Sequence, residues 1–453
     1  MSGIDVNVKR FVRYFYDPPP KNDSLSGEPI WCLGQEYTSG PVIKQEVGQD
    51  DVVEVSSVTE SHTTASEVSA PKSSPPSSEA SGPAAVKDTD DMSIIDAQTA
   101  GESLSEDGWP SAFLDDFESR IWMTYRAGFP AIPKSQDPSA TSSMTFSVRL
   151  RNLGETQGFT SDTGWGCMIR SGQSLLANAL VLFRLGREWR RGQSPSAESN
   201  IVSMFADDPQ APFSIHRFVQ HGASACGKHP GQWFGPSATA SCIRELSSEC
   251  ASVGLNVYIT NDSSDVYEDR FRSISCASGT MKSTLILLGT RLGIDRVTPV
   301  YWEALKATLQ YPQSIGIAGG RPSSSHYFVA TQGSSLFYLD PHETKPYLPY
   351  RSPATDDSSI YSSEELSTVH TRRLRAIHLT EMDPSMLIGF LIRDENDWND
   401  WKRRLSEVKG KGIIHVIAEE PKSTGEGERD EAVDEVLSFD EDGDEDDATE
   451  VGD

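Results

Sequence analysis

The stretch Thr163-Gly164-Trp165-Gly166-Cys167-Met168-Ile169-Arg170 places a cysteine directly after a glycine-rich turn and at the start of an apolar segment. Apolar side chains recur after Cys167 at roughly helical spacing, which predicts a helix that continues to about Phe183. The start of a helix has unpaired backbone N–H groups and the positive end of the helix dipole, and both stabilise a thiolate. Because such positions lower the pKa of a cysteine, Cys167 is the candidate nucleophile.

The alternative for Cys167 is the ordinary one, in which a free cysteine is a small buried hydrophobe. The surrounding glycines favour the nucleophile instead, since glycine lets the backbone approach a substrate closely and adopt conformations that other residues avoid. A nucleophilic thiol also needs a base within hydrogen-bonding reach. The hypothesis therefore depends on a suitable histidine elsewhere in the chain.

Composition limits the partners and the compartment. The chain has 453 residues, 36% of them hydrophobic, and a mean hydropathy of -0.44, which predicts a folded body together with disordered segments. Its formal net charge of -27 argues against nucleic acid as a partner and disfavours non-specific docking on anionic lipid. Six irregularly spaced cysteines, with no recognisable secretory signal and no bilayer-spanning run, indicate a reducing cytoplasm.

Changes in composition divide the chain into five predicted parts. Residues 41–107 are rich in Ser, Thr, Pro and acidic residues and predict a disordered insertion, because they cannot bury enough apolar surface to offset the entropy of ordering. Residues 420–453 form an acidic tail whose like charges repel one another. The other three parts are an N-terminal arm at 1–27, an apolar docking segment at 28–40 and the folded body at 108–419.

Helical and strand patterns are mixed within the folded body, which predicts an α+β fold. Residues 109–126 are predicted to form one helix. Its apolar face consists of Phe113, Phe117, Ile121 and Trp122. The predicted strands are 257–259, 284–288, 327–330 and 336–339, the last two joined as a hairpin by the turn at 332–335.

Two histidines compete for the role of base. In Asp340-Pro341-His342 the first and last residues can face one cleft, because residues two apart in an extended chain project to the same side. Proline favours that extended geometry, although a plain turn after a strand would explain the same residues. His326 is the rival, since Cys167, His326 and Asp340 follow the papain order of nucleophile, base and orienter. Chain order alone leaves the choice open.

A zinc site is a further possibility that the residues disfavour. Cys226, His229 and Cys242 offer three ligands, but their spacing lacks the second close pair of a zinc site, and the glycine-rich loop around them accounts for these residues. We therefore expect neither a metal nor any other cofactor.

Five blocks of sequence resemble the autophagins, the family of cysteine endopeptidases that process the ubiquitin-like modifier of autophagy, and the chain looks like a fungal-type member. The blocks span nearly the whole folded body, and the third and fifth are highly specific as a pair. The blocks are Glu28-Pro29-Ile30-Trp31; Arg120–Arg126 with Phe129-Pro130-Ala131-Ile132; Thr160–Cys167; Gly231–Pro236; and Gly319–Pro322 through His326-Tyr327-Phe328 to Tyr338–His342.

The resemblance implies a papain-like cysteine protease fold with a small auxiliary subdomain. It also implies that His342 is the base, that Asp340 orients it and that His326 only supports them. The Tyr125 hydroxyl and the backbone N–H of Cys167 would stabilise the oxyanion. A cover over the resting nucleophile would lift when substrate binds. The residues of this cover would be Trp233, Arg321, Pro322, Ser323 and Ser324.

The implied reaction is hydrolysis after the C-terminal glycine of the modifier. Removing a C-terminal extension would mature the precursor, and cleaving the amide to phosphatidylethanolamine would release the modifier from membranes. Both steps would serve autophagosome formation and transport from cytoplasm to vacuole. The resemblance thus implies a monomer that touches membrane only through its lipidated substrate. It would act in the cytoplasm and at the pre-autophagosomal structure, with access to the nucleus.

Two other functions would use the same residues. A non-catalytic scaffold could bind the modifier through the fold alone, although it would have no need of the full set Cys167, His342, Asp340 and Tyr125. A transglutaminase-like acyltransferase uses the same kind of triad, but the calcium-binding loops that some of those enzymes carry are not evident here. Some relatives have a second cysteine four residues after the nucleophile, where this chain has Ser171, so no redox switch through that neighbour is expected.

Overall fold

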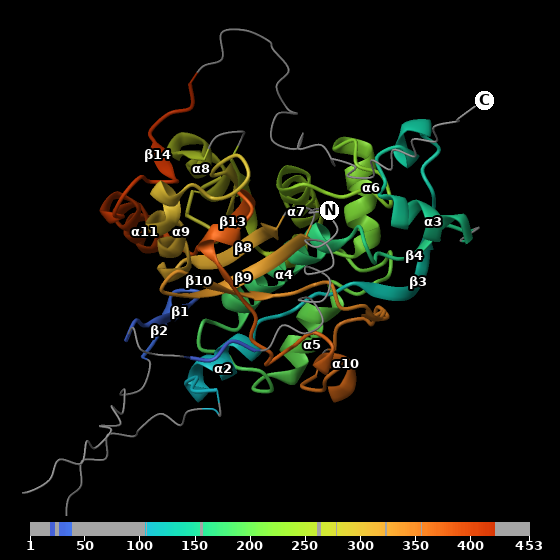
Figure 1. Cartoon of the computed structure of the whole chain (residues 1–453), viewed down its shortest axis with the longest axis horizontal. Helices are drawn as coiled ribbons and strands as arrows, with labels where there is room; N and C mark the ends of the chain where they lie inside the picture. Colours follow the sequence, from blue (N-terminus) through green and yellow to red (C-terminus); the bar gives the residue numbers. More distant parts are fainter. Residues whose placement is uncertain are drawn as a thin grey trace, which may run out of the picture. The chain divides into compact units, whose positions relative to one another are not determined.

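A central β-sheet with helices packed on both faces is the main feature of the computed structural model (Figure 1). The structure describes residues 19–22, 27–38, 105, 107–154, 157–260, 264–277, 279–321, 324–354 and 356–421, which all belong to one structural unit. Most of the predicted N-terminal arm and nearly all of the predicted insertion and acidic tail lie outside the described residues.

The described strands of the main sheet are nine in number. Neighbours in this sheet are antiparallel, except for β5 and β7, which are parallel. The order is β12 (Ala376–His378), β10 (Ser335–Leu339), β9 (Ser324–Gln332), β8 (Ser314–Arg321), β13 (Ser385–Ile392), β7 (Thr284–Arg291) and β5 (Asn256–Ile259), with β1 (Ile30–Cys32) joined to β9 and β2 (Gln35–Tyr37) joined to β1.

Both faces of the sheet are buried, as β7 illustrates. Leu285 and Leu287 belong to one hydrophobic core, and the alternate residues Ile286 and Leu288 belong to another. A strand covered on both faces is apolar without interruption, which is why the run at 284–288 predicted a strand correctly.

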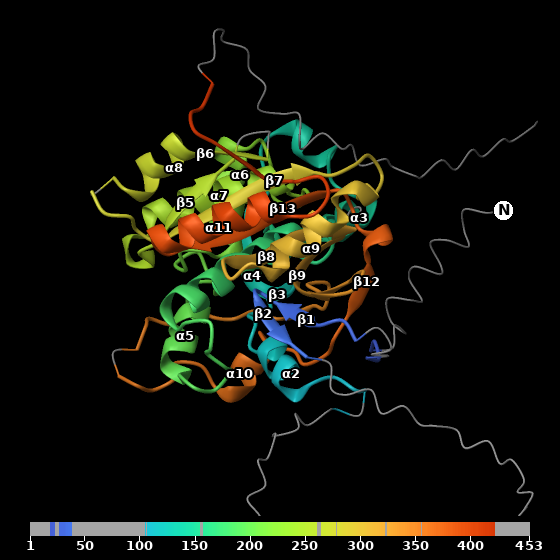
Figure 2. The ribbon, with the colours of Figure 1, turned by 90° about the vertical axis from the view of Figure 1, so that its left-hand side faces the viewer.

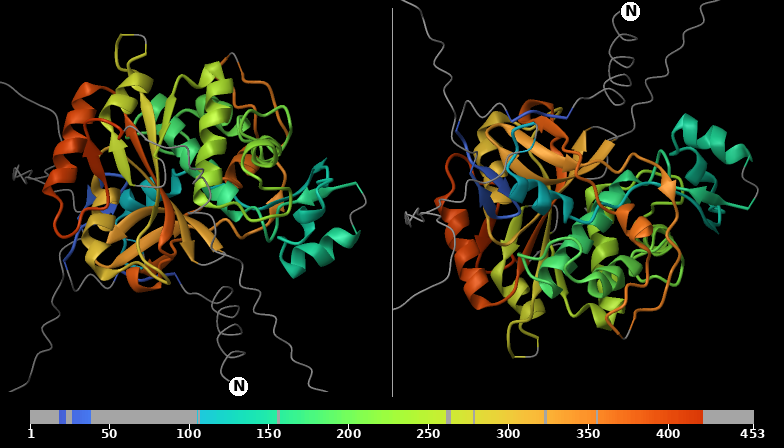
Figure 3. Two further views of the ribbon diagram at one scale, coloured as in Figure 1. Left: turned by 90° about the horizontal axis from the view of Figure 1, so that it is seen from above. Right: turned by 90° about the horizontal axis from the view of Figure 1, so that it is seen from below.

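Figures 2 and 3 show the two helical layers. One layer contains α2 (Ser111–Glu118), α4 (Cys167–Arg184), α5 (Pro195–Ser203), α6 (Ile215–Ala225) and α7 (Pro236–Glu249), and the other contains α8 (Glu268–Ser275), α9 (Trp302–Gln310) and α11 (Glu395–Glu407).

Helix α4 is the centre of the first layer. It packs against β8, β9 and β13, and every residue from Cys167 to Leu182 is buried. The helix predicted after Cys167 is therefore confirmed. A helix that is buried all round is typical of the core of a large domain, and it gives its N-terminal residue a fixed position.

The predicted single helix at 109–126 is wrong in its second half. Helix α2 ends at Glu118, and residues 121–125 are not helical. The backbone N–H of Ile121 donates to Asn178 Oδ1 of α4 at 2.9 Å, so a tertiary contact replaces the hydrogen bond that a longer helix would need. The four apolar residues of the predicted face are all buried as expected.

A smaller sheet assembles the ends of three segments that are far apart in sequence. It consists of β11 (Lys345–Pro346), β3 (Arg126–Ile132) and β4 (Phe159–Ser161), in that order. Tyr125 immediately precedes β3, the turn to Cys167 follows β4, and His342 precedes β11. This sheet therefore gathers three candidate site residues, while the small auxiliary subdomain expected from the resemblance stays a prediction.

The predicted hairpin and docking segment are both present. Strands β9 and β10 pair through the turn at 332–335, and Trp31 and Cys32 of β1 pair with Thr331 and Ala330 of β9.

Among the described residues, none of the helices has the length and the apolar character needed to cross a membrane. The remaining elements are η1 (Pro138–Thr141), α3 (Phe146–Gly154), η2 (Ala251–Val253), β6 (Asp265–Tyr267), η3 (Pro299–Tyr301), α10 (Ser363–Ser367), η4 (Leu379–Glu381) and β14 (His415–Ile417).

Candidate active site

The turn before Cys167 is held by a buried aspartate. The carbonyl of Asp162 accepts the backbone N–H groups of Trp165 at 3.1 Å and Gly166 at 2.9 Å. Its carboxylate accepts Nε of Arg170 at 2.7 Å, and both side chains are fully buried. Gly164 has a φ of +90°, and a Cβ at Gly166 would collide with the Asp162 side chain. Glycine is therefore required at both positions of this turn.

Cys167 is the first residue of α4 and is only 2% exposed. Burial alone would raise the pKa of its thiol, but a hydrogen bond with His342 and the charge of that imidazole outweigh burial, so the pKa lies below its ordinary value. The backbone N–H of Ser325 and the Tyr125 hydroxyl also donate to the sulfur. The site therefore favours the thiolate that a nucleophile needs.

Asp340 and His342 face each other as predicted, but through a turn at Pro341 and His342 and not through an extended segment, since the backbone N–H of His342 donates to Oδ1 of Asp340 at 3.1 Å. Nδ1 of His342 donates to Oδ1 of Asp340 at 2.6 Å. The indole Nε1 of Trp122 donates to the Asp340 carbonyl at 2.7 Å, and Arg375 lies 3.3 Å from Oδ2 of the carboxylate. Although burial opposes ionisation of Asp340, His342 and the other positive groups hold the pKa of this carboxyl well below its usual range.

His342 links the carboxylate to the thiol. Burial disfavours its charged form, but the hydrogen bonds to Asp340 and Cys167 raise the pKa of the imidazole to about 10. The Ser324 hydroxyl lies 3.3 Å from Nε2 of the same ring. A lowered thiol pKa beside a raised imidazole pKa favours a thiolate–imidazolium pair.

His326, the rival base, lies beside His342, with the two ring centroids 5.2 Å apart. Its Nε2 lies 3.7 Å from Asp340 Oδ1, beyond hydrogen-bonding distance, and its ring packs edge-on against Tyr338 with centroids 4.5 Å apart. Among the largest interactions that lower the pKa of Cys167 are the hydrogen bond with His342 and the charge of its imidazole. The geometry thus favours the Asp340–His342 pair over the papain-order alternative.

Tyr125 is brought to the nucleophile by the small sheet. Its backbone N–H donates to the Pro341 carbonyl at 2.8 Å, and its carbonyl accepts the N–H of Lys345 at 2.9 Å. Its ring meets the His342 ring edge-on at 5.3 Å. Burial, followed by the nearby Cys167 charge, raises the pKa of the Tyr125 phenol, so the hydroxyl stays protonated and able to donate a hydrogen bond.

The expected cover is described only in part. Arg321 and Ser324 pair at the ends of β8 and β9, and the contact of Ser324 with His342 places the end of this hairpin beside the triad. Pro322 and Ser323 lie outside the described residues. Trp233 lies in the loop between α6 and α7, half-buried against the main core. Its role as a cover stays a prediction.

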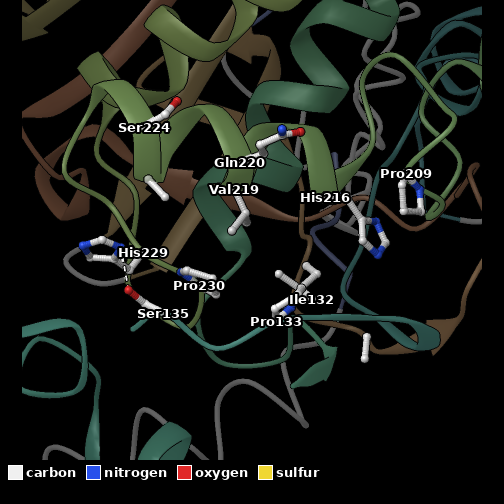
Figure 4. A pocket seen from close by; sticks show the side chains of 12 residues that line it. Ile132, Pro133, Ser135, Pro209, His216, Val219, Gln220, Ser224, His229 and Pro230 are labelled. Atoms are coloured by element: carbon white, nitrogen blue, oxygen red, sulfur yellow. Dashed lines mark hydrogen bonds between the residues drawn. The ribbon is translucent and has the colours of Figure 1, made fainter. Parts of the chain in front are cut away.

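The three residues weighed for zinc are not all together. His229 Nδ1 lies 3.1 Å from the Ser135 hydroxyl, at the edge of a pocket of about 520 Å³ between α6 and the end of β3 (Figure 4). Cys226 and Cys242 instead lie close to His221. No triad residue lines the pocket, whose walls are Ala131, Ile132, Pro133, Ser135, Pro209, His216, Val219, Gln220, Ala223, Ser224, His229 and Pro230.

Sequence reasoning missed the buried residues that support Asp340 and the turn before Cys167. Arg170 bridges Asp162 and Asp207, whose Oδ1 lies 2.7 Å from its Nη1. Trp122 and Arg375 restrain Asp340. The one available signal was the charged Arg170 in the first turn of a helix with a long apolar face, since a buried guanidinium must find carboxylate partners.

Known proteins match this chain along most of its length. A family model described as the peptidase C54 catalytic domain matches residues 110–404. The probable cysteine protease atg4 of Botryotinia fuckeliana is 58% identical over 448 residues, covering 98% of this chain and 99% of that protein. The proteins of the same name from Sclerotinia sclerotiorum and Coccidioides immitis are 55% and 53% identical, each covering 98% of this chain and 99% and 100% of their own lengths.

These matches confirm the resemblance that the five sequence blocks indicated, including its fungal character. The matched family model contains Cys167, His342 and Asp340, the residues that the fold brings together. It also begins with α2 and ends within α11, so it includes both helical layers of the fold. This chain therefore belongs to the peptidase C54 family, the family of Atg4 cysteine proteases.

Proposed function

We propose that this protein hydrolyses the bond after the C-terminal glycine of the autophagy ubiquitin-like modifier, with Cys167 as nucleophile, His342 as base and Asp340 as its orienter. One observation carries the proposal. His342 is hydrogen-bonded both to the Cys167 thiol and to the Asp340 carboxylate. A base hydrogen-bonded on one side to the nucleophile and on the other to its orienter is what covalent hydrolysis of an amide requires.

The first half of the reaction forms a thioester. The Cys167 thiolate attacks the glycine carbonyl carbon, and the carbonyl oxygen becomes an oxyanion. When the tetrahedral intermediate collapses, the C–N bond breaks and the imidazolium of His342 gives its proton to the leaving amine. Asp340 holds the ring in the required orientation and stabilises its charge through the 2.6 Å hydrogen bond.

The second half regenerates the enzyme. Neutral His342 takes a proton from water, and the resulting hydroxide attacks the thioester carbonyl. The modifier leaves with a free glycine carboxylate, and the sulfur of Cys167 leaves as the thiolate. The Tyr125 hydroxyl and the backbone N–H of Cys167 donate hydrogen bonds to the oxyanion in both halves. This role is supported by the buried, protonated phenol that already contacts the Cys167 sulfur.

Glycine before the cleaved bond is consistent with restricted access to Cys167. The nucleophile is almost wholly buried, and the end of the β8–β9 hairpin reaches His342. If Trp233 and residues 321–324 cover the nucleophile at rest, substrate must displace the hairpin end and pass through a narrow slot. A residue without a Cβ fits such a slot best.

The same chemistry serves two substrates. Cleavage of a C-terminal extension matures the modifier precursor, and cleavage of the amide to phosphatidylethanolamine releases the modifier from membrane. Both leaving groups are amines that His342 can protonate. The proposed setting is the cytoplasm and the pre-autophagosomal structure, with access to the nucleus. The protein would act as a monomer without a cofactor and reach membrane through its lipidated substrate.

The test is cleavage of the modifier precursor by the full-length chain, compared with Cys167→Ala, His342→Ala and His326→Ala. We expect no cleavage by the first two variants and reduced cleavage by the third. Full activity in His342→Ala with none in His326→Ala would restore the papain-order triad. Binding of the precursor without cleavage by the wild type would overturn the proposed hydrolysis.

A further inference from the structure

Three metal-ligating side chains meet between α6 and α7, and none of them belongs to the triad. The ligand atoms of His221, Cys226 and Cys242 all lie within 4.8 Å of one another. We call these three residues the thiol cluster. His229, the histidine that sequence spacing pointed to, is held instead by Ser135 and by Asp137, whose Oδ2 lies 3.6 Å from its Nε2.

We propose that the thiol cluster binds a thiophilic divalent cation of the Zn²⁺ class through two thiolates and one imidazole, with solvent as the fourth ligand. The donor set suits this class of ion, because Zn²⁺ prefers sulfur and imidazole nitrogen in a tetrahedral arrangement. Three protein ligands and one open position give an exchangeable site, whereas structural zinc sites use four protein ligands.

The distances suit the proposed ion after small movements. Bond lengths of about 2.3 Å to sulfur and about 2.0 Å to nitrogen put neighbouring ligand atoms of a tetrahedron roughly 3.5 to 3.8 Å apart. The cluster must therefore contract by about 1 Å at most. Cys242 is fully buried in α7, but His221 and Cys226 are partly exposed at the end of α6, so an ion can enter from solvent along that side.

Binding must displace protons. The hydrogen bond with Cys226 and then burial raise the pKa of the Cys242 thiol above its ordinary value, so the protonated form is favoured without metal. Its S–H donates weakly to the Phe218 carbonyl at 3.5 Å. When the cation binds, each thiol releases one proton to solvent and two sulfur–metal bonds form. The resulting site is neutral, and affinity for the cation rises with pH.

A bound cation would join α6 to α7 across the loop between them. Cys226 caps the end of α6, Cys242 lies near the middle of α7, and residues 227–235 connect the two helices. This loop carries Trp233. The cation would thus restrain the loop. An effect of the cation on catalysis rests on the proposed function. Binding of the cation is independent of that function.

The test titrates Co²⁺, a spectroscopic substitute for Zn²⁺, into the full-length chain with a Cys167→Ala background that removes the catalytic thiol. We expect one equivalent to bind with the thiolate-to-cobalt absorption of a tetrahedral site, and Zn²⁺ to displace it. Adding Cys226→Ser should abolish the thiolate band, and His221→Gln should weaken binding at least about tenfold. Adding Cys276→Ser, at a partly buried cysteine outside the cluster, should change nothing.

Thermal unfolding of each variant separates loss of the site from loss of the fold. Zn²⁺ should also slow hydrogen exchange at 227–235 in the Cys167→Ala protein and not in the Cys226→Ser derivative. The proposal fails if no thiolate band forms at saturating Co²⁺ or if Cys226→Ser leaves the band intact. Binding without a thiolate band would point to His326, Asp340 and His342 as the ligands and would equally contradict it.

Discussion

Cys167 and Cys242 are both buried thiols close to a histidine, yet their surroundings shift their pKa values in opposite directions. The pKa of Cys167 is lowered and that of Cys242 is raised. Cys167 begins a helix, and its partner His342 is bound to Asp340. Cys242 lies within a helix, and its side-chain hydrogen bond is with a second thiol, that of Cys226.

Proximity of a cysteine to a histidine is therefore not enough to make a nucleophile. A carboxylate must hold the imidazole in its charged form, and the helix N-terminus must favour the anion. Around Cys242 the described residues provide neither the carboxylate nor the helix N-terminus. There a histidine and two thiols form a cluster that is better suited to a metal ion. The predictions below test each part of this difference, beginning with the largest effect.

Replacing the nucleophile should abolish cleavage. Cys167→Ala removes the attacking sulfur, and we expect the rate of precursor cleavage to fall on the order of 10⁶-fold, as for the nucleophile of other triads. Single-turnover cleavage followed on gels would measure the loss. Cys276→Ala is the matched control and should keep the wild-type rate. Appreciable cleavage by Cys167→Ala would mean that another group attacks the carbonyl.

Removing the charge that orients the base should have the next largest effect. Asp340→Asn keeps the shape of the side chain, and we expect kcat/KM to fall on the order of 10⁴-fold. The wild-type thiolate–imidazolium pair exists above the lowered pKa of Cys167 and is lost as pH rises through about 10, the pKa of His342. Without the carboxylate the pKa of His342 falls, so the alkaline limb of the kcat/KM profile should move to lower pH. An unmoved limb would contradict the role of Asp340.

Breaking the buried support of the nucleophile turn should reduce stability. Arg170→Ala leaves Asp162 and Asp207 as buried carboxylates without their partner, which is expected to cost about 3–5 kcal/mol of the free energy of unfolding. Denaturant unfolding would measure the change. Arg403→Ala, which removes an exposed ion pair on α11, should have little effect. Equal effects of the two variants would show that the Asp162–Arg170 pair does not support the turn.

Removing His326, the rival base, should have the smallest effect on cleavage. His326 lies 3.7 Å from Asp340, beyond hydrogen-bonding distance, whereas His342 is hydrogen-bonded to both Asp340 and Cys167. We expect His326→Ala to lower kcat/KM by about tenfold at most, the equivalent of one ordinary hydrogen bond. The shape of the pH profile should stay that of the wild type. A loss as large as that of His342→Ala would make His326 the base.

Local patterns in the sequence predicted the parts of the site that are themselves local. The Gly-Trp-Gly turn, the helix after Cys167 and the same-side placement of Asp340 and His342 depend on residues a few positions apart, and each is present in the structure. The strand at 284–288 and the β9–β10 hairpin were predicted for the same reason. The resemblance to the autophagins supplied the choice of base and the role of Tyr125.

Features that depend on distant contacts could not be predicted. The helix predicted at 109–126 ends early because Asn178, more than fifty residues later, takes the N–H of Ile121. The approach of Tyr125 to Pro341 requires the parallel pairing of β3 with β11, which no local pattern encodes. The zinc alternative that the sequence analysis disfavoured grouped His229 with Cys226 and Cys242, whereas the packing of α6 on α7 brings His221 there.

The most direct measurement of the central difference is the ultraviolet absorbance of the Cys167 thiolate, taken as wild type minus Cys167→Ala while pH is raised. We predict a thiolate that forms below the ordinary pKa of a cysteine thiol. In His342→Ala it should form at a higher pH than in the wild type, because only the hydrogen bonds from Ser325 and Tyr125 then oppose burial. A thiolate that titrates identically in the wild type and in His342→Ala would contradict the account.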